Sequence, residues 1–136
     1  MKIDFLVAEE IRPEAGGKMT ILGFIPNNTL LITSSRPEDA PKDIKDGIDR
    51  LAFLVVISDL HEGVHKFKGQ IFCPSGEPYN QETSFGEGVA QQGTSHSIVI
   101  ELKPFIIKEY GFYHFHFYVN DVLTKFTFEI RPQPKG

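Results

Sequence analysis

Short apolar stretches, each bounded by glycine, proline or asparagine, follow one another along the chain. Several alternate between apolar and polar positions, which is the period of a strand with one covered face. We predict eight strands, over residues 3–8 (extending as far as 12), 18–24, 29–33, 51–57, 64–73, 97–102, 112–119 and 122–130. Residues 51–57 (LAFLVVI) are apolar without alternation, which indicates a central strand covered on both faces.

The last two predicted strands form a hairpin, because only Asn120 and Asp121 separate them. A two-residue loop of this kind needs positive φ at both positions, which Asn and Asp tolerate better than other residues with a side chain. The loop pairs Val119 with Val122 and sets the register outwards from there. One face then carries Phe117 opposite Thr124, Phe115 opposite Phe126 and Tyr113 opposite Phe128. The other face carries His116 opposite Lys125, His114 opposite Thr127 and Phe112 opposite Glu129.

Two polar segments interrupt the pattern. Residues 34–47 contain two prolines and many charged residues, and we interpret them as a connecting loop. Residues 74–95 are rich in Gly, Ser, Gln and Glu. We expect a long polar loop there, and a loop of that length in a small domain is usually functional or without a fixed structure.

The chain of 136 residues has the size of one domain, so we expect a single domain over residues 1–136. Twelve Phe and four Tyr with no Trp favour strands, because ring side chains pack well on a pleated surface. The prediction is an all-β fold: a mostly antiparallel two-sheet β-sandwich, Ig-like or Greek-key, with about seven to eight strands. A small β-barrel is the alternative.

Charge and cysteine content indicate which classes of partner and which cellular compartment are expected. The net charge of −4 and the scattered basic residues argue against nucleic-acid binding, which needs clustered Lys and Arg. The single Cys excludes an intrachain disulfide. The apolar stretch near the N-terminus is short and is followed by Glu9 and Glu10, so it predicts neither a signal sequence nor a membrane span. We therefore expect a cytoplasmic protein without a membrane partner.

Turn and strand features resemble those of a family of small bacterial proteins of unknown function. They are a first strand ending in Ala8-Glu9-Glu10, a Gly16-Gly17-Lys18 turn, a strand with the late Gly23, and the aromatic C-terminal hairpin. The resemblance implies a β-sandwich over most of the chain. It implies no catalytic or binding residues.

His114 and His116 are the strongest candidates for metal chemistry. They lie two apart on one predicted strand, so both rings point to the same face, as two metal ligands could. Lys125 lies directly opposite His116, however, and a cation beside a metal is unfavourable. We therefore interpret both as histidines on a half-exposed sheet face and expect no metal and no cofactor.

Exposed rings suggest a binding surface instead. Phe112, His114, His116 and Tyr118 share the outer face of the last hairpin, while Tyr79 and Phe85 lie in the predicted loop. Exposed rings stack on sugars or bury against a protein. Three hypotheses follow: a non-enzymatic binding or assembly module that contacts an unknown protein or a copy of itself, for example as a homodimer; a small-ligand or carbohydrate-binding sandwich; and a metal-dependent enzyme that uses the His-x-His pair.

Overall fold

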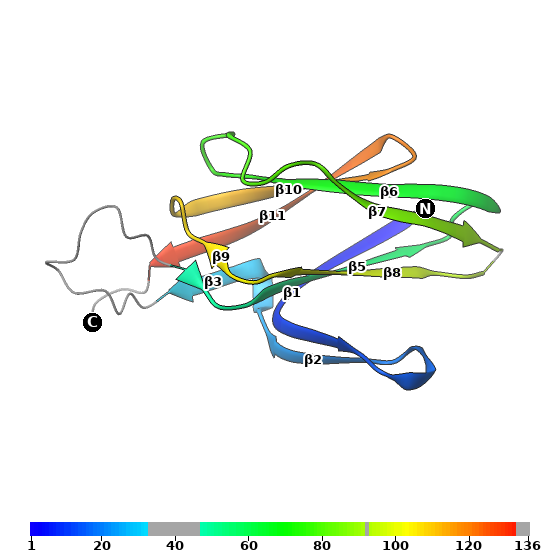
Figure 1. Cartoon of the computed structure of the whole chain (residues 1–136), viewed down its shortest axis with the longest axis horizontal. Coiled ribbons are helices and arrows are strands. Elements are labelled where there is room, and N and C mark those ends of the chain that lie inside the picture. Colours follow the sequence, from blue (N-terminus) through cyan, green and yellow to red (C-terminus); the bar gives the residue numbers. More distant parts are fainter. Residues whose placement is uncertain (33–46, 92, 133–136) are drawn as a thin grey trace, which may run out of the picture.

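Two packed β-sheets make up the protein, as the computed structural model shows (Figure 1). It describes residues 1–32, 47–91 and 93–132. The strands are β1 (Lys2–Pro13), β2 (Met19–Phe24), β3 (Thr29–Ile32), β4 (Gly47–Ile48), β5 (Leu51–Ser58), β6 (Gly63–Phe72), β7 (Thr83–Ala90), β8 (His96–Leu102), β9 (Phe105–Ile106), β10 (Gly111–Val119) and β11 (Val122–Pro132). Two short 3-10 turns, η1 (Ala15–Gly17) and η2 (Pro26–Asn28), flank β2. Among the described residues, no helix combines the length and apolarity that crossing a membrane takes.

The strand order is that of an immunoglobulin-type sandwich. One sheet has the order β2-β1-β5-β8, the other has the order β3-β11-β10-β6-β7, and β4 pairs with β9 separately. All pairs are antiparallel except β3 with β11. Each main sheet begins and ends with a different edge strand, so neither sheet closes on itself. The predicted sandwich is therefore confirmed, and the alternative of a closed barrel is wrong.

The eight predicted strands are all present. The described residues form one further strand in the two main sheets, β7, and the separate two-residue strands β4 and β9. The prediction of one polar loop over residues 74–95 is therefore wrong for Thr83–Ala90, which pairs with β6. The local sequence does not predict this strand, because glycines interrupt the alternation of apolar and polar side chains. The strand is stabilised by pairing with β6, which the local sequence does not indicate. The predicted loop over residues 34–47 lies almost entirely outside the described residues.

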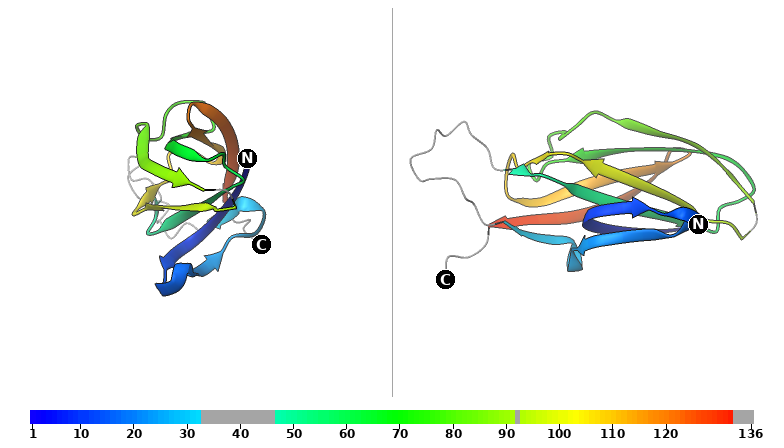
Figure 2. Two further views of the ribbon diagram at one scale, coloured as in Figure 1. Left: turned by 90° about the vertical axis from the view of Figure 1, so that its right-hand side faces the viewer. Right: turned by 60° about the horizontal axis from the view of Figure 1, so that its bottom comes forward.

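Strand β1 folds back on itself in its middle, as Figures 1 and 2 both show. Its first half pairs with β5, and its second half pairs with β2. The returning half brings Ile11 onto the far side of the first sheet, where it packs with Ala52 and Leu54 of β5. This explains why β5 is buried on both faces, as its unbroken apolar sequence predicted.

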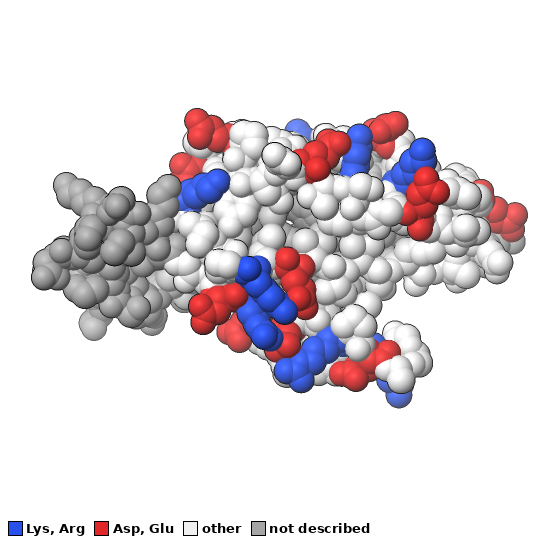
Figure 3. Space-filling view, viewed as in Figure 1, with Lys and Arg blue, Asp and Glu red and all other residues white. Residues whose placement is uncertain are grey.

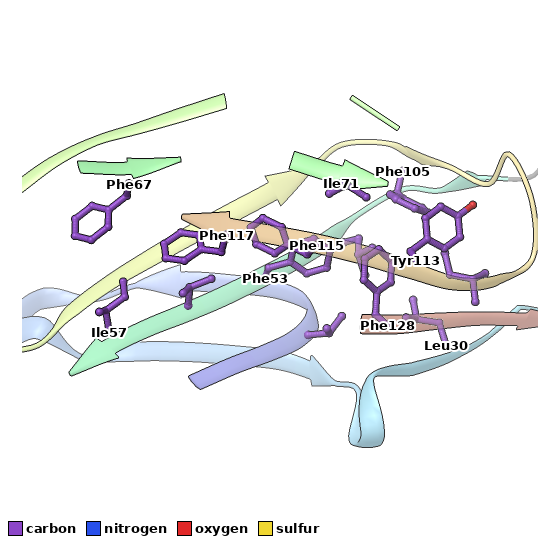
Figure 4. Packing of buried hydrophobic residues seen from close by; sticks show 14 of the residues in the cluster. Leu30, Phe53, Ile57, Phe67, Ile71, Phe105, Tyr113, Phe115, Phe117 and Phe128 are labelled. Atoms are coloured by element: carbon purple, nitrogen blue, oxygen red, sulfur yellow. The ribbon is translucent and has the colours of Figure 1, made fainter. Parts of the chain in front are cut away.

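The main core lies between the two sheets and is largely aromatic (Figure 4). Phe53 of β5 packs on Phe115 and Phe128 with ring centroids 5.5 and 5.0 Å apart. At the start of β10, the hydroxyl of Tyr113 donates to the carbonyl of Glu109 at 2.6 Å. This is the tyrosine corner of immunoglobulin-type sandwiches, and it ties the chain entering β10 to the core.

The β10–β11 hairpin has the register that its turn predicts. All of the predicted pairs are present, from Val119 opposite Val122 to Phe112 opposite Glu129. Asn120 and Asp121 have φ of 48° and 69°, as a two-residue loop requires. The agreement confirms which hairpin side chains face the core and which face outwards.

Candidate functional site

The outward face of the five-stranded sheet carries a strip of rings along its middle. Phe112, His114, His116 and Tyr118 project from β10, and Phe72 joins them from β6. We call these five residues the aromatic strip. Phe112 is 56% exposed and the other four are half-buried. Phe112 is thus accessible to a partner, and the other four rings are accessible in part.

His116 lies at the centre of the strip. Its ring packs against Phe72 with centroids 4.5 Å apart. Burial lowers the pKa of His116 below its ordinary value, and the charges of Lys125 and His114 lower it further. His116 is therefore mainly in its neutral form at pH 7.

Lys68 of β6 closes one end of the strip. Its ammonium lies 5.0 Å from the centroid of the Tyr118 ring and 3.3 Å from the carboxylate of Asp121. A second carboxylate, that of Glu82, lies 3.7 Å away, and the bond to Asp121 contributes most to raising the pKa of Lys68. A hollow of about 480 Å³ opens beside these residues. The ammonium is thus held over the ring by neighbouring carboxylates.

Charged residues of both signs surround the strip. Lys66 pairs with Glu87 at 3.9 Å on the β7 side, and Arg131 pairs with Glu129 at 2.6 Å on the β11 side. Figure 3 shows acidic and basic side chains interspersed along the margin over β6 and β7. The face therefore has an aromatic strip along its middle, flanked by charged residues of both signs.

Tyr79 and Phe85, the two other predicted surface rings, lie away from this face. The Tyr79 ring stacks on Phe105 at 4.6 Å, and its hydroxyl accepts the N–H of Ile106 at 2.9 Å. Burial raises the pKa of the Tyr79 hydroxyl. Phe85 of β7 stacks on Phe117 at 6.2 Å and packs against the core. Neither ring contributes to the aromatic strip, because both are partly buried and pack against the core.

The geometry around His114 and His116 lacks further metal ligands. The two rings share one face, as predicted, and Lys125 lies opposite His116. Within the described parts of the chain, no three His, Cys, Asp or Glu side chains gather as a metal site would require. His61, His65 and His96 do not join them: His65 bonds instead to the carbonyl of His61 at 2.7 Å.

Sequence reasoning missed Phe72 as a member of the strip. Phe72 has the same parity in β6 as Lys68 and Gln70, which the alternation places on the outer side, so a signal was present. The position of Phe72 beside His116 could not be predicted from the sequence, because it depends on β6 lying next to β10. Strand order in space is set by contacts distant in sequence.

Comparison of the chain with known protein families finds no matching family, and comparison with curated proteins finds no match. The resemblance to small bacterial proteins therefore stays a prediction.

Proposed function

We propose that this protein is a non-enzymatic binding module that holds a protein partner against the aromatic strip. The observation that carries the proposal is the open strip itself, with Phe112 more than half exposed at one end and a neutral His116 at its centre. Contiguous exposed apolar surface on a small domain is typical of interaction sites.

The arrangement of the face favours a protein over a sugar. Protein interfaces have an aromatic centre depleted of charge and a polar rim. The strip has that centre, and its rim carries the ion pairs of Lys66 and Arg131. A carbohydrate, the alternative ligand, stacks on open ring faces, yet Lys68 lies over Tyr118 and Phe72 packs on His116. The second alternative, a metal-dependent enzyme, has two candidate ligands in the strip and no third among the described residues.

The test is site-specific photocrosslinking in cells, followed by measurement with purified proteins. A photoreactive residue replaces Phe112, and in a control chain it replaces Phe24, a ring that is similarly exposed at 55% on β2 of the other sheet. We expect one protein to be captured through position 112 and not through position 24. Binding of that purified protein is then measured with Phe112→Ala and Tyr118→Ala, each expected to weaken it about tenfold or more, since buried interface aromatics dominate affinity.

Two results would count against the proposal. One is equal capture at both positions. The other is an affinity for the captured protein that neither alanine variant changes. A change in intrinsic Tyr fluorescence on adding oligosaccharides would instead support the carbohydrate alternative.

The proposal includes a cytoplasmic location without nucleic-acid partners. The support is the single cysteine, which is buried, and the mixed sign of the charged rim. Fractionation of cells that express the full chain tests the location.

A further inference from the structure

We infer that the free edge of β8 pairs with β8 of a second copy of this chain, antiparallel and across a two-fold axis through Val99. This inference concerns a different surface from the aromatic strip and does not depend on the proposed function. It rests on how this edge differs from the other three sheet edges.

Three of the four edges are short or interrupted. β3 has four residues in the part of the chain that the structure describes. β7 contains a register shift against β6 and has Gly86 at φ of 90°. β2 has Gly23 at φ of 65°, with the Glu9 side chain lying across it. Such features blunt an edge against pairing with another strand.

β8 has none of these features. Its seven residues pair with β5 without a break, and none has positive φ. The charged residue on it, Glu101, points outwards and bonds to Lys103 at 2.8 Å. An extended edge with unpaired backbone groups is a template for another strand.

The interior beside β8 is also incompletely covered. Phe53, Val55 and Ile57 of β5 are fully buried in the core. Their partners across the ladder, Ile100, Ile98 and His96, remain partly exposed. A strand added at this edge would cover these inward-facing side chains.

One register pairs the whole of β8 with β8 of a second copy. Val99 is the midpoint of His96–Leu102, so an axis through it pairs the whole strand. Residues directly opposite share a face in an antiparallel pair. Ile98 then lies beside Ile100 of the copy on the inward face. On the outward face Val99 meets its own copy, and Ser97 lies beside Glu101 of the copy.

The symmetry has a consequence for the outer face of the other sheet. The two-fold axis is perpendicular to the sheet that contains β8. Rotation about it therefore leaves the outward face of the five-stranded sheet pointing in the same direction in both copies. Both copies therefore present their aromatic strips on the same side of the dimer. A partner with two binding sites would be held by both.

The register is tested by disulfide formation from introduced cysteines. In a Val99→Cys chain the two Cα atoms would lie about 4.5–5.5 Å apart, within the range of a disulfide. In a Ser97→Cys chain they would lie about 14 Å apart, too far to bridge. We expect mild oxidation to give covalent dimers of Val99→Cys and none of Ser97→Cys. Equal crosslinking of both variants would overturn the register.

Opposite charges at position 97 test the dimer without touching the core, because Ser97 is exposed. Ser97→Lys places an ammonium beside Glu101 of the copy, and Ser97→Glu places a carboxylate there. Each change occurs twice per dimer. We therefore expect Ser97→Lys to lower the dissociation constant of the dimer, and Ser97→Glu to raise it, by roughly two- to thirty-fold. Sedimentation equilibrium measures them, and Phe112→Ala should leave them unchanged.

A monomeric mass at millimolar protein would overturn the inference. So would a dimer that responds to Phe112→Ala and not to the two changes at position 97. Neither result bears on whether the aromatic strip binds a different protein, which the monomer could still do.

Discussion

The side-chain amide of Asn120, in the β10–β11 turn, donates to Nδ1 of His65 in β6 at 2.8 Å. The amide oxygen of Asn120 accepts the backbone N–H of Lys66 at 2.8 Å, which fixes the orientation of the amide. Nδ1 of His65 is therefore the acceptor, and Nε2 donates to the carbonyl of His61 at 2.7 Å. One turn residue thus joins the hairpin to the neighbouring strand.

Replacing Asn120 with Gly keeps a residue that accepts positive φ but removes both side-chain bonds. The nearly buried His65 ring loses its donor, so we expect the free energy of unfolding to fall by about 1–3 kcal/mol. The control is Asp121→Gly, which loses only the ion pair of an exposed carboxylate with Lys68. We expect that control to change stability by no more than about 0.5 kcal/mol. Urea unfolding measures both, and equal losses would contradict the role given to the Asn120 side chain.

The features predicted from sequence are those that neighbouring residues determine. The pairing of His116 with Lys125 followed from a two-residue turn and the alternation of side chains, both local properties. The burial of Tyr79 did not follow, because it depends on Phe105 coming from another part of the chain. β7 was missed for the same reason: its ladder partner is β6, and its own sequence contains two glycines and few apolar residues. The candidate site was predicted to the extent that it lies on one hairpin.

Removing the hydroxyl of Tyr113 tests the tyrosine corner. The hydroxyl donates to the carbonyl of Glu109 at 2.6 Å, and the ring is fully buried. Tyr113→Phe leaves that carbonyl without this donor while keeping the ring, so we expect a loss of about 1–2 kcal/mol in the free energy of unfolding. Tyr118→Phe is the matched control, because its ring lies on the outer face. If the two variants unfolded at the same denaturant concentration, the bond to Glu109 would contribute nothing to stability.

Acid should destabilise the protein in part through His116. Because burial holds the pKa of His116 below its ordinary value, the folded state binds fewer protons than the unfolded state as pH falls. The contribution of neutral His116 to the free energy of unfolding is fully present above the ordinary pKa of 6.5. It is lost as the pH falls from there through the lowered pKa. Unfolding curves measured between neutral and mildly acidic pH should show less loss in His116→Gln than in the unchanged protein.

The causes of this shift can be separated by NMR titration. Lys125→Met removes the charge with the larger effect on His116, so the pKa of His116 should rise towards its ordinary value. Lys66→Met removes a cation from the rim that does not contribute to this shift, so it should leave the titration of His116 in place. A pKa that Lys125→Met does not move would assign the shift to burial and to His114, without a contribution from Lys125.

Gly69, in the middle of β6, makes room for two rings of the core. A Cβ atom at this position would lie 2.6 Å from Cε1 of Phe115 and 3.0 Å from Cε2 of Phe85. Both rings come from neighbouring strands and are packed on Phe117, so they have little freedom to move aside. We expect Gly69→Ala to lower the free energy of unfolding by about 1–3 kcal/mol through overpacking.

Gly47→Ala is the control for that change. Its Cβ would lie 3.4 Å from the nearest atom, the carbonyl oxygen of Phe105, and its φ is not positive. Stability should there stay the same or rise by up to about 1 kcal/mol, because alanine restricts the unfolded chain. Thermal unfolding of the two variants compares them directly. A Gly69→Ala protein as stable as Gly47→Ala would show that Phe85 and Phe115 can shift, and that β7 is held by its backbone pairing with β6 and not by the fit of Phe85.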